Sequence, residues 1–308
     1  MQKNKFLSFI AILGVFLLIL PITATADDTP QLTQGEADQG SITFGLRLTG
    51  GASLLMRNDI NDHMQGMNDY FDDIPIASLS SEFELLKMGM DFSGEILISF
   101  MPHFSLGLGA GYFSAGKETT AEIVAYSVIN EEMTYHPKFS AVPVTLSFYY
   151  EIPAGSALQV VLNAGFGYYL GTVNFDLVDR ITDVSTWTEE TETWSAKSNT
   201  FGFHGGIDLE FDVAPHLALV VGAKGRYAKI TDLTGDLEWD FDSSYGYSNS
   251  GTDKDLTLWF GDYELYGEKY PHLAFYEDKP TYSWWSDVRK AEVNLSGIVF
   301  QAGIKITF

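Results

Sequence analysis

Residues 297–308, which read GIVFQAGIKITF, decide how the rest of the chain is interpreted. Counting back from the terminal aromatic residue, every second residue is apolar, and those between are polar or small apart from Val299. Successive side chains of a β-strand point to opposite faces, so the pattern indicates a strand with one apolar and one polar face. We expect the apolar face to meet lipid. Its members are Phe308, Ile306, Ile304, Ala302, Phe300 and Ile298.

The other end of the chain has the pattern of a secretory signal peptide. Lys3 and Lys5 precede an apolar run over 6–20, and Ala24-Thr25-Ala26 offers a cleavage site of small residues. Because the run is too short to span a bilayer, we expect residues 1–26 to be removed, with an uncleaved anchor as the alternative. Residues 27–40 are polar and acidic, and we expect them to form a periplasmic tail.

The composition limits the classes of function. The chain has no cysteine, so disulfides, thiol chemistry and a lipid-modified cysteine anchor are excluded. Its formal net charge is −23, and loss of the two signal lysines would make it −25. Nucleic-acid binding needs a basic surface, so no nucleic-acid partner is expected.

Eight segments alternate between apolar and polar residues, and each is long enough for the roughly 9–11 residues that a tilted strand needs to cross a bilayer. The segments are 42–55, 84–100, 104–114, 140–152, 157–175, 199–213, 217–230 and 297–308. Three connections are minimal turns that contain proline, at 101–103, 153–155 and 214–216. The other four are long, at about 56–83, 115–139, 176–198 and 231–291.

Short turns at one end and long loops at the other, with an even strand count, predict a particular all-β fold. It is an eight-stranded antiparallel up-and-down transmembrane β-barrel over 41–308, with extracellular long loops and both termini in the periplasm. Residues 256–266 are also strand-like, which leaves ten strands as an alternative. Lipid exposure of Asp262 and Glu264 would be costly, so we interpret this segment as an extracellular ribbon.

The last residues also carry a resemblance. Gln301, Gly303, Ile306 and Phe308 resemble the C-terminal insertion signal of bacterial outer-membrane barrels, which the barrel-assembly machinery reads. With the signal peptide, the eight strands and the loop asymmetry, the chain resembles the small barrels of the OmpA, OmpX and OmpW type, without a recognisable subfamily motif. The resemblance implies a monomer in the outer membrane of a Gram-negative cell, in contact with outer-membrane lipid and lipopolysaccharide. It implies a fold and not a function.

The interior of an eight-stranded barrel is just wide enough for side chains to fill it. Buried charges must pair or be solvated, so we interpret the inward charges as an ion-pair network that closes the lumen. A narrow, porin-like channel for ions or small solutes is the alternative. The inward ionisable residues are Arg47, Lys87, Asp91, Glu95, Glu151, Asp208, Glu210, Lys224, Arg226 and Lys305.

A surface hydrolase or lipid A-modifying enzyme is a third hypothesis, because some outer-membrane barrels are proteases or lipid A-modifying enzymes. His204 is expected to point inward, four residues before Asp208, but the sequence gives it no positioned partner, and a general base needs one. We therefore expect no catalytic residue and no cofactor.

The long loops carry most of the negative charge and many tyrosine and tryptophan residues. Residues 58–73 are rich in Asn and Asp but fail the EF-hand pattern, which leaves a loop-bound divalent cation as a hypothesis only. The aromatic residues are expected either to lie at the membrane interface or to bind an extracellular sugar or protein. The leading hypothesis is a structural or surface-interaction role.

Overall fold

The computed structural model describes residues 42–74, 77–125, 129–265 and 267–308. The expected signal peptide (1–26) and periplasmic tail (27–40) lie outside the described residues. Fifteen strands and one helix are present in the described part, and its strand pairings are antiparallel. The prediction of an all-β antiparallel fold is confirmed, whereas a count of eight strands does not account for the whole chain.

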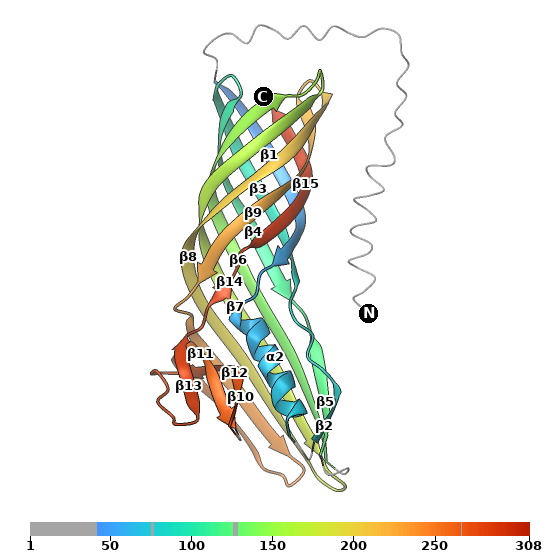
Figure 1. The fold of residues 1–308 in the computed structure, drawn as a ribbon, viewed down its shortest axis with the longest axis vertical. Helices are drawn as coiled ribbons and strands as arrows, with labels where there is room; N and C mark the ends of the chain where they lie inside the picture. The colour runs from blue at the N-terminus through green and yellow to red at the C-terminus, as the bar shows by residue number, and fades with distance from the viewer. Residues whose placement is uncertain (1–41, 75–76, 126–128, 266) are drawn as a thin grey trace. The chain divides into compact units, whose positions relative to one another are not determined.

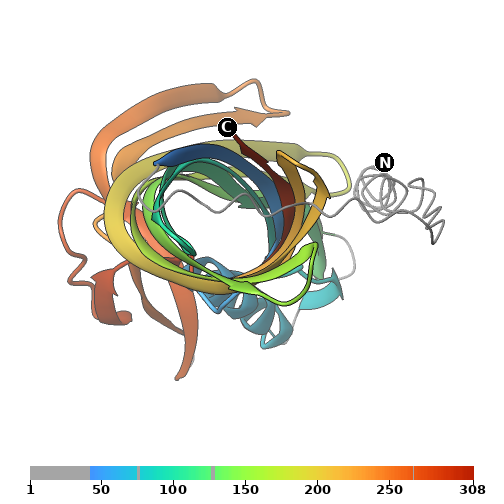
Figure 2. The same cartoon turned by 90° about the horizontal axis from the view of Figure 1, so that it is seen from above.

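Eight of these strands form a closed ring, which Figure 2 shows end on. Each pairs with two neighbours, in the order β1–β3–β4–β6–β7–β8–β9–β15, and β15 returns to β1. The strands are β1 (Thr43–Leu55), β3 (Met88–Met101), β4 (Phe104–Gly116), β6 (Ile129–Pro153), β7 (Leu158–Thr182), β8 (Trp187–Ala214), β9 (Leu217–Ile230) and β15 (Gly297–Thr307).

Three ring strands are much longer than the others, because β6, β7 and β8 contain 25, 25 and 28 residues. They continue beyond the ring, where β6 pairs with β5 and β8 pairs with β10. This second region of the sheet, called the extension below, is continuous with the ring (Figure 1). The additional strands are β2 (Ala77–Ser81), β5 (Thr119–Ala125), β10 (Thr234–Ser243), β11 (Ser248–Leu265), β12 (Glu268–Tyr276), β13 (Trp285–Lys290) and β14 (Val293–Asn294).

The four segments expected to be long loops are therefore largely regular structure. The ladder between β6 and β7 runs without interruption from the ring to Asn130 and Thr182, and beyond the ring the inward residues of the two strands are apolar as far as Met133 and Leu177. Residues 256–265 lie in β11, which pairs with β10, β12 and β13 outside the ring. The ten-strand alternative is thus not the arrangement in the ring.

Residues 59–72, expected to lie in a loop, form the helix α2 (Asp59–Asp72). Asn58 caps it, because its side-chain oxygen accepts a hydrogen bond from the Asn61 N–H at 3.0 Å. The helix lies between β12 and β2 and buries Ile60, Met64 and Phe71. It thereby covers the open side of the sheet extension, and an apolar core fills the space between. No helix in the described residues is long and apolar enough to cross a membrane.

Candidate functional site: the interior of the ring

The interior at the end of the ring with the short turns, uppermost in Figure 1, is bridged by a lysine. Lys305 on β15 contacts Glu151 on β6 at 2.5 Å and Glu210 on β8 at 2.8 Å. Strands β15 and β6 lie four positions apart in either direction around the ring, so they face each other. This ion pair therefore crosses the full width of the interior.

The next layer centres on a buried arginine. The Arg47 guanidinium on β1 donates to Asp208 at 2.6 Å and to Glu210 at 2.8 Å, both on β8. Asp208 also accepts from the Asn163 and Gln301 side-chain amides at 2.8 and 2.9 Å. All of these side chains are buried, and the hydrogen bonds offset the cost of removing the charges from water.

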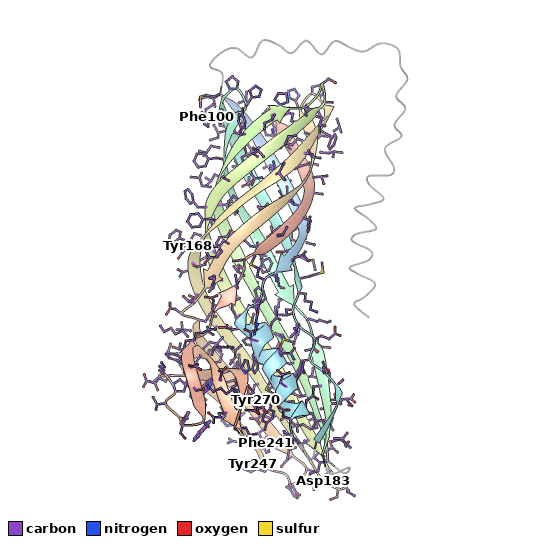
Figure 3. The ribbon with its side chains drawn as sticks, in the orientation of Figure 1. Phe100, Tyr168, Asp183, Phe241, Tyr247 and Tyr270 are labelled. Atoms are coloured by element: carbon purple, nitrogen blue, oxygen red, sulfur yellow. The ribbon has the colours of Figure 1, made fainter. Side chains whose placement is uncertain are left out.

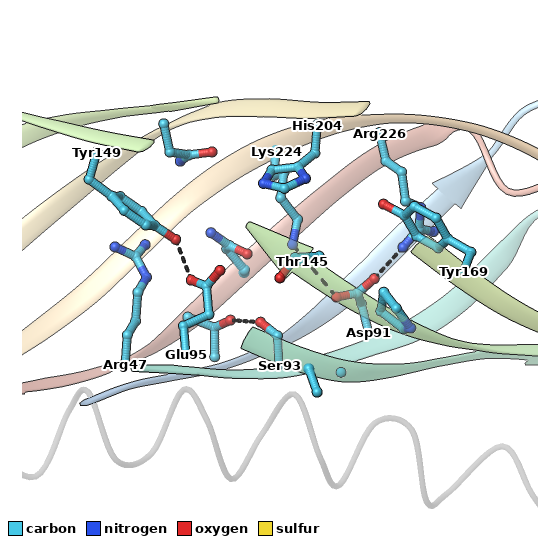
Figure 4. Close-up of a pocket in the computed structure, with 16 residues that line it drawn as sticks. Arg47, Asp91, Ser93, Glu95, Thr145, Tyr149, Tyr169, His204, Lys224 and Arg226 are labelled. Carbon is cyan, nitrogen blue, oxygen red and sulfur yellow. Dashed lines mark hydrogen bonds and ion pairs between the residues drawn. The ribbon is translucent and has the colours of Figure 1, made fainter. Parts of the chain in front are cut away.

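A serine and a histidine lie in the middle layer, and Figure 4 shows the histidine, His204, among the residues that line the interior cavity. Ser147 Oγ lies 2.9 Å from Glu95 Oε1 and 3.0 Å from His204 Nε2, and the Tyr149 hydroxyl donates to the other oxygen of Glu95. This arrangement was not foreseen, because Ser147 and His204 are far apart in sequence and meet only through the register of β6, β7 and β8.

The last polar layer is held by Asp91 on β3. It contacts Arg226 at 2.5 Å and Lys224 at 3.9 Å, both on β9. Arg226 also donates to the Leu295 carbonyl at 2.9 Å, and its carbon Cζ lies 4.5 Å from the centroid of the Phe113 ring. Phe113 belongs to the apolar core that α2 covers, so the polar interior ends at this layer.

Little free space remains between these layers. The interior holds a cavity of about 30 Å³, lined by residues that include Arg47, Asp91, Glu95 and His204. A cavity of this size takes one or two water molecules. Ser147 and His204 are thus paired in a place that has room for water and not for an organic substrate.

The structure brings nine of the ten ionisable residues expected inside into this interior, and Lys87 is the exception. Lys87 is exposed and precedes β3, which begins at Met88, so the alternation of the strand does not extend to it. Of the residues resembling an insertion signal, Gln301 lies in the network and Phe308 is exposed on the outside. Ile306 pairs with Leu46, and Gly303 packs so closely against β1 that a Cβ would lie 2.0 Å from the Leu48 carbonyl oxygen.

Outside the ring, two histidines join α2 to β12. His63 Nδ1 accepts a hydrogen bond from the Leu273 N–H at 3.3 Å, and its ring lies edge-on to His272, with centroids 4.9 Å apart. Burial lowers the pKa of His63 well below its usual value and that of His272 to about 4. The N-terminus of the helix is held by Arg289, which donates to both carboxylate oxygens of Asp59 at 2.6 and 2.7 Å.

The far end of the extension carries acidic side chains. Burial and the nearby Asp179 raise the pKa of Glu131 to about 7, and burial and Glu190 raise that of Asp179 to about 6. No group of three or more ligand side chains in the described residues could hold a metal ion. Asp59, in the segment suggested for a loop-bound cation, is already paired with Arg289.

An aromatic pair lies on the surface of the extension between β12 and β13. The rings of Tyr282 and Trp284 stack with centroids 4.8 Å apart and planes 9° apart, although their side chains are 43% and 50% exposed. Tyr276 packs beside Tyr282, with ring centroids 5.9 Å apart. The described residues thus present a flat aromatic surface to solvent.

A scan against protein-family models finds no match, and a search of curated proteins finds none either. Two solved structures are similar in part. A major outer membrane protein from Thermus thermophilus has a TM-score of 0.33 and 12% identity over 87% of this chain and 100% of that one. The outer membrane protease OmpT from Escherichia coli has a TM-score of 0.23 and 10% identity over 87% and 95%. At these TM-scores neither likeness indicates what this protein does.

Proposed function

We propose that this protein is a sealed, eight-stranded outer-membrane β-barrel that carries a folded domain on the cell surface, and that this domain and not the lumen is its working part. The outward face of the ring supports the membrane location. On β7 the outward residues are apolar up to Leu170, and the next one is Thr172. In register with Thr172, the neighbouring strands carry Ser140 and Lys197.

This change from apolar to polar residues at one level across three strands is the observation that carries the proposal. The apolar part of β7, from Leu158 to Leu170, is long enough to cross a bilayer. Aromatic side chains border it at both ends, with Phe100 near one border and Tyr168 near the other (Figure 3). Such aromatic girdles are typical of outer-membrane barrels. The short turns then face the periplasm, and the barrel is of the small, monomeric OmpA, OmpX and OmpW type.

The contacts inside the ring favour a sealed lumen over a channel. Side chains from opposite strands meet in two layers, in the Lys305–Glu151 pair and in the contact of Arg226 with Phe113. The apolar core below α2 lies beyond them. The pairing of Ser147 with His204 is best interpreted as part of this seal, because a hydrolase would need space for its substrate.

The exposed Tyr282–Trp284 pair supports a surface-interaction role, since rigid aromatic surfaces suit the binding of sugars and proteins. The test measures the binding of proteoliposomes, which display the protein on their surface, to an array of neutral oligosaccharides. Wild-type vesicles should bind at least one sugar, and the Tyr282→Ser/Trp284→Ser variant should not. Tyr245→Ser, at a separate exposed tyrosine, serves as the control. If no vesicle binds any sugar, this surface does not recognise neutral sugars.

A further inference from the structure

A second cavity lies outside the ring, between α2 and the ends of β3 and β4. Its volume is about 560 Å³, which is within the range of small-molecule sites. Its lining comes from α2, from residues 82–88 and from Gly116 and Lys117 at the end of β4. Phe83 and Leu86 form a buried apolar wall that is continuous with the core below α2.

The amide side chain of Asn68 on α2 fixes this wall. It donates to the Phe83 carbonyl at 3.0 Å and accepts from the Phe83 N–H at 2.8 Å. Asn61, two helical turns earlier on α2, makes the same pair of bonds with the backbone of Leu86, both at 2.8 Å. The segment is therefore held in place by the helix, and the cavity does not depend on a loose loop.

The cavity opens at the border of the apolar outer face. Met88 lines the cavity and also begins the outward apolar row of β3, which continues with Met90 and Phe92. In a membrane-inserted barrel, this border lies at the headgroups of the outer leaflet. Met88 and the apolar wall thus belong to the same cavity, which would let an acyl chain enter from the bilayer beside Met88, although the rest of the lining is polar and includes Glu82 and Glu84.

A lysine with no ion-pair partner in the described part of the chain lies at this opening. Lys117 pairs with Glu84, whereas the exposed Lys87, which also lines the cavity, has no carboxylate within ion-pair distance among the described residues. A lysine at headgroup level keeps its stem on apolar surface and its ammonium in contact with phosphate. Most other basic residues near α2, such as Arg289 and Lys290, are already paired with aspartates.

We propose that this cavity binds one lipid of the outer leaflet whose phosphate carries a net negative charge, with an acyl chain against Phe83, Leu86 and Met88 and the phosphate on Lys87. The inference rests on the proposed membrane location, because it requires the bilayer surface to lie near Met88. It adds a defined lipid site to the general contact between barrel and membrane.

Native mass spectrometry of the refolded mature chain tests the proposal, with phosphatidylglycerol, phosphatidylcholine of the same chains, and inorganic phosphate as probes. We expect one phosphatidylglycerol to be retained, and Lys87→Glu to weaken its retention about fivefold or more. Gln65→Trp, on the exposed lining of the cavity, should abolish it by filling the space, whereas Lys254→Glu, on β11, should not.

Three results would overturn the proposal. They are equal retention of the two lipids, unchanged retention in Lys87→Glu, or binding of inorganic phosphate as tight as that of the lipid. Flotation with vesicles, measured on the same samples, separates this failure from that of the membrane assignment. A chain that does not float refutes the barrel, whereas one that floats but retains no phosphatidylglycerol refutes the lipid site alone. Heat-dependent electrophoretic mobility verifies that each variant is folded.

Discussion

The guanidinium of Arg226 lies 4.5 Å from the centre of the Phe113 ring, although the two residues are on β9 and β4, which face each other across the ring of strands. This contact marks the plane where the charged interior meets the apolar core. At this point the charged side chain packs on the aromatic face. The proposed seal depends on this layer more than on any other.

Replacement of Arg226 by methionine should lower the free energy of unfolding by about 3–5 kcal/mol, because Asp91 would be left as a buried charge without its closest partner. The midpoint of urea unfolding in detergent micelles measures this. The double variant Arg226→Met/Asp91→Leu should recover a large part of the loss. Equal destabilisation of the single and double variants would argue against an ion-pair network.

A charge added to the outer face should destabilise the protein strongly inside the apolar band and only weakly beyond it. Leu108→Arg, on the exposed apolar face of β4, should cost about 2–4 kcal/mol of stability in a bilayer. Asn174→Arg, an outward residue of β7 beyond the apolar band, should cost little. Urea titration of both variants in vesicles makes the comparison. If Asn174→Arg is as harmful as Leu108→Arg, the membrane border has been misplaced.

Gly303 should be required for closure of the ring and not only as part of a recognition signal. A Cβ there would lie 2.0 Å from the Leu48 carbonyl oxygen, so Gly303→Val should push β15 away from β1. The variant should therefore fail to refold in detergent, where no assembly machinery is present. Gly155→Ala, in an exposed turn, is the control. Normal refolding of Gly303→Val in detergent would show that the glycine matters only to the machinery.

Docking of α2 should weaken in acid. His63 and His272 have pKa values lowered by burial, so the undocked form takes up protons below about pH 6.5 and docking is lost as the pH falls towards 4. Because the chain has no cysteine, the labelling rate of Met64→Cys reports exposure of the helix's buried face. The rate should rise on acidification, and less so with His272→Phe added.

A local probe is needed for that experiment because the raised pKa values of Glu131 and Asp179 act in the opposite sense. The folded chain holds extra protons on these carboxyls, so they favour the folded state at low pH and lose this effect as the pH rises through about 6 to 7. A labelling rate at Met64→Cys that stays constant from pH 7 to 4 would contradict the histidine account.

The strand pattern could be predicted from the sequence because alternation is local. The same reasoning placed Lys87 inside the ring, and this was wrong because alternation orients a side chain only where the strand exists, and β3 begins one residue later. The pairing of Ser147 with His204 and of Lys305 with Glu151 could not be predicted. Partners across the ring depend on the register of every intervening strand, which the sequence does not specify locally.

The helix α2 was missed although its signals are present. Asn58 is a capping residue, acidic residues follow it, and Ile60, Met64, Met67 and Phe71 recur at helical spacing. The abundance of Asn and Asp over 58–73, taken alone, favours a loop. The extension of β6, β7 and β8 was underestimated for a related reason, since its outward residues become polar where the strands leave the apolar band.

Single-channel recording on the refolded mature chain in planar bilayers tests the central claim most directly. Fluorescent labelling of a single introduced cysteine would verify that protein is present in each membrane. A sealed barrel predicts inserted protein with no defined current steps at any applied voltage. Stable, reproducible conductance steps from the folded protein would contradict the seal and would make the charges around Arg47 and Asp91 the lining of a channel.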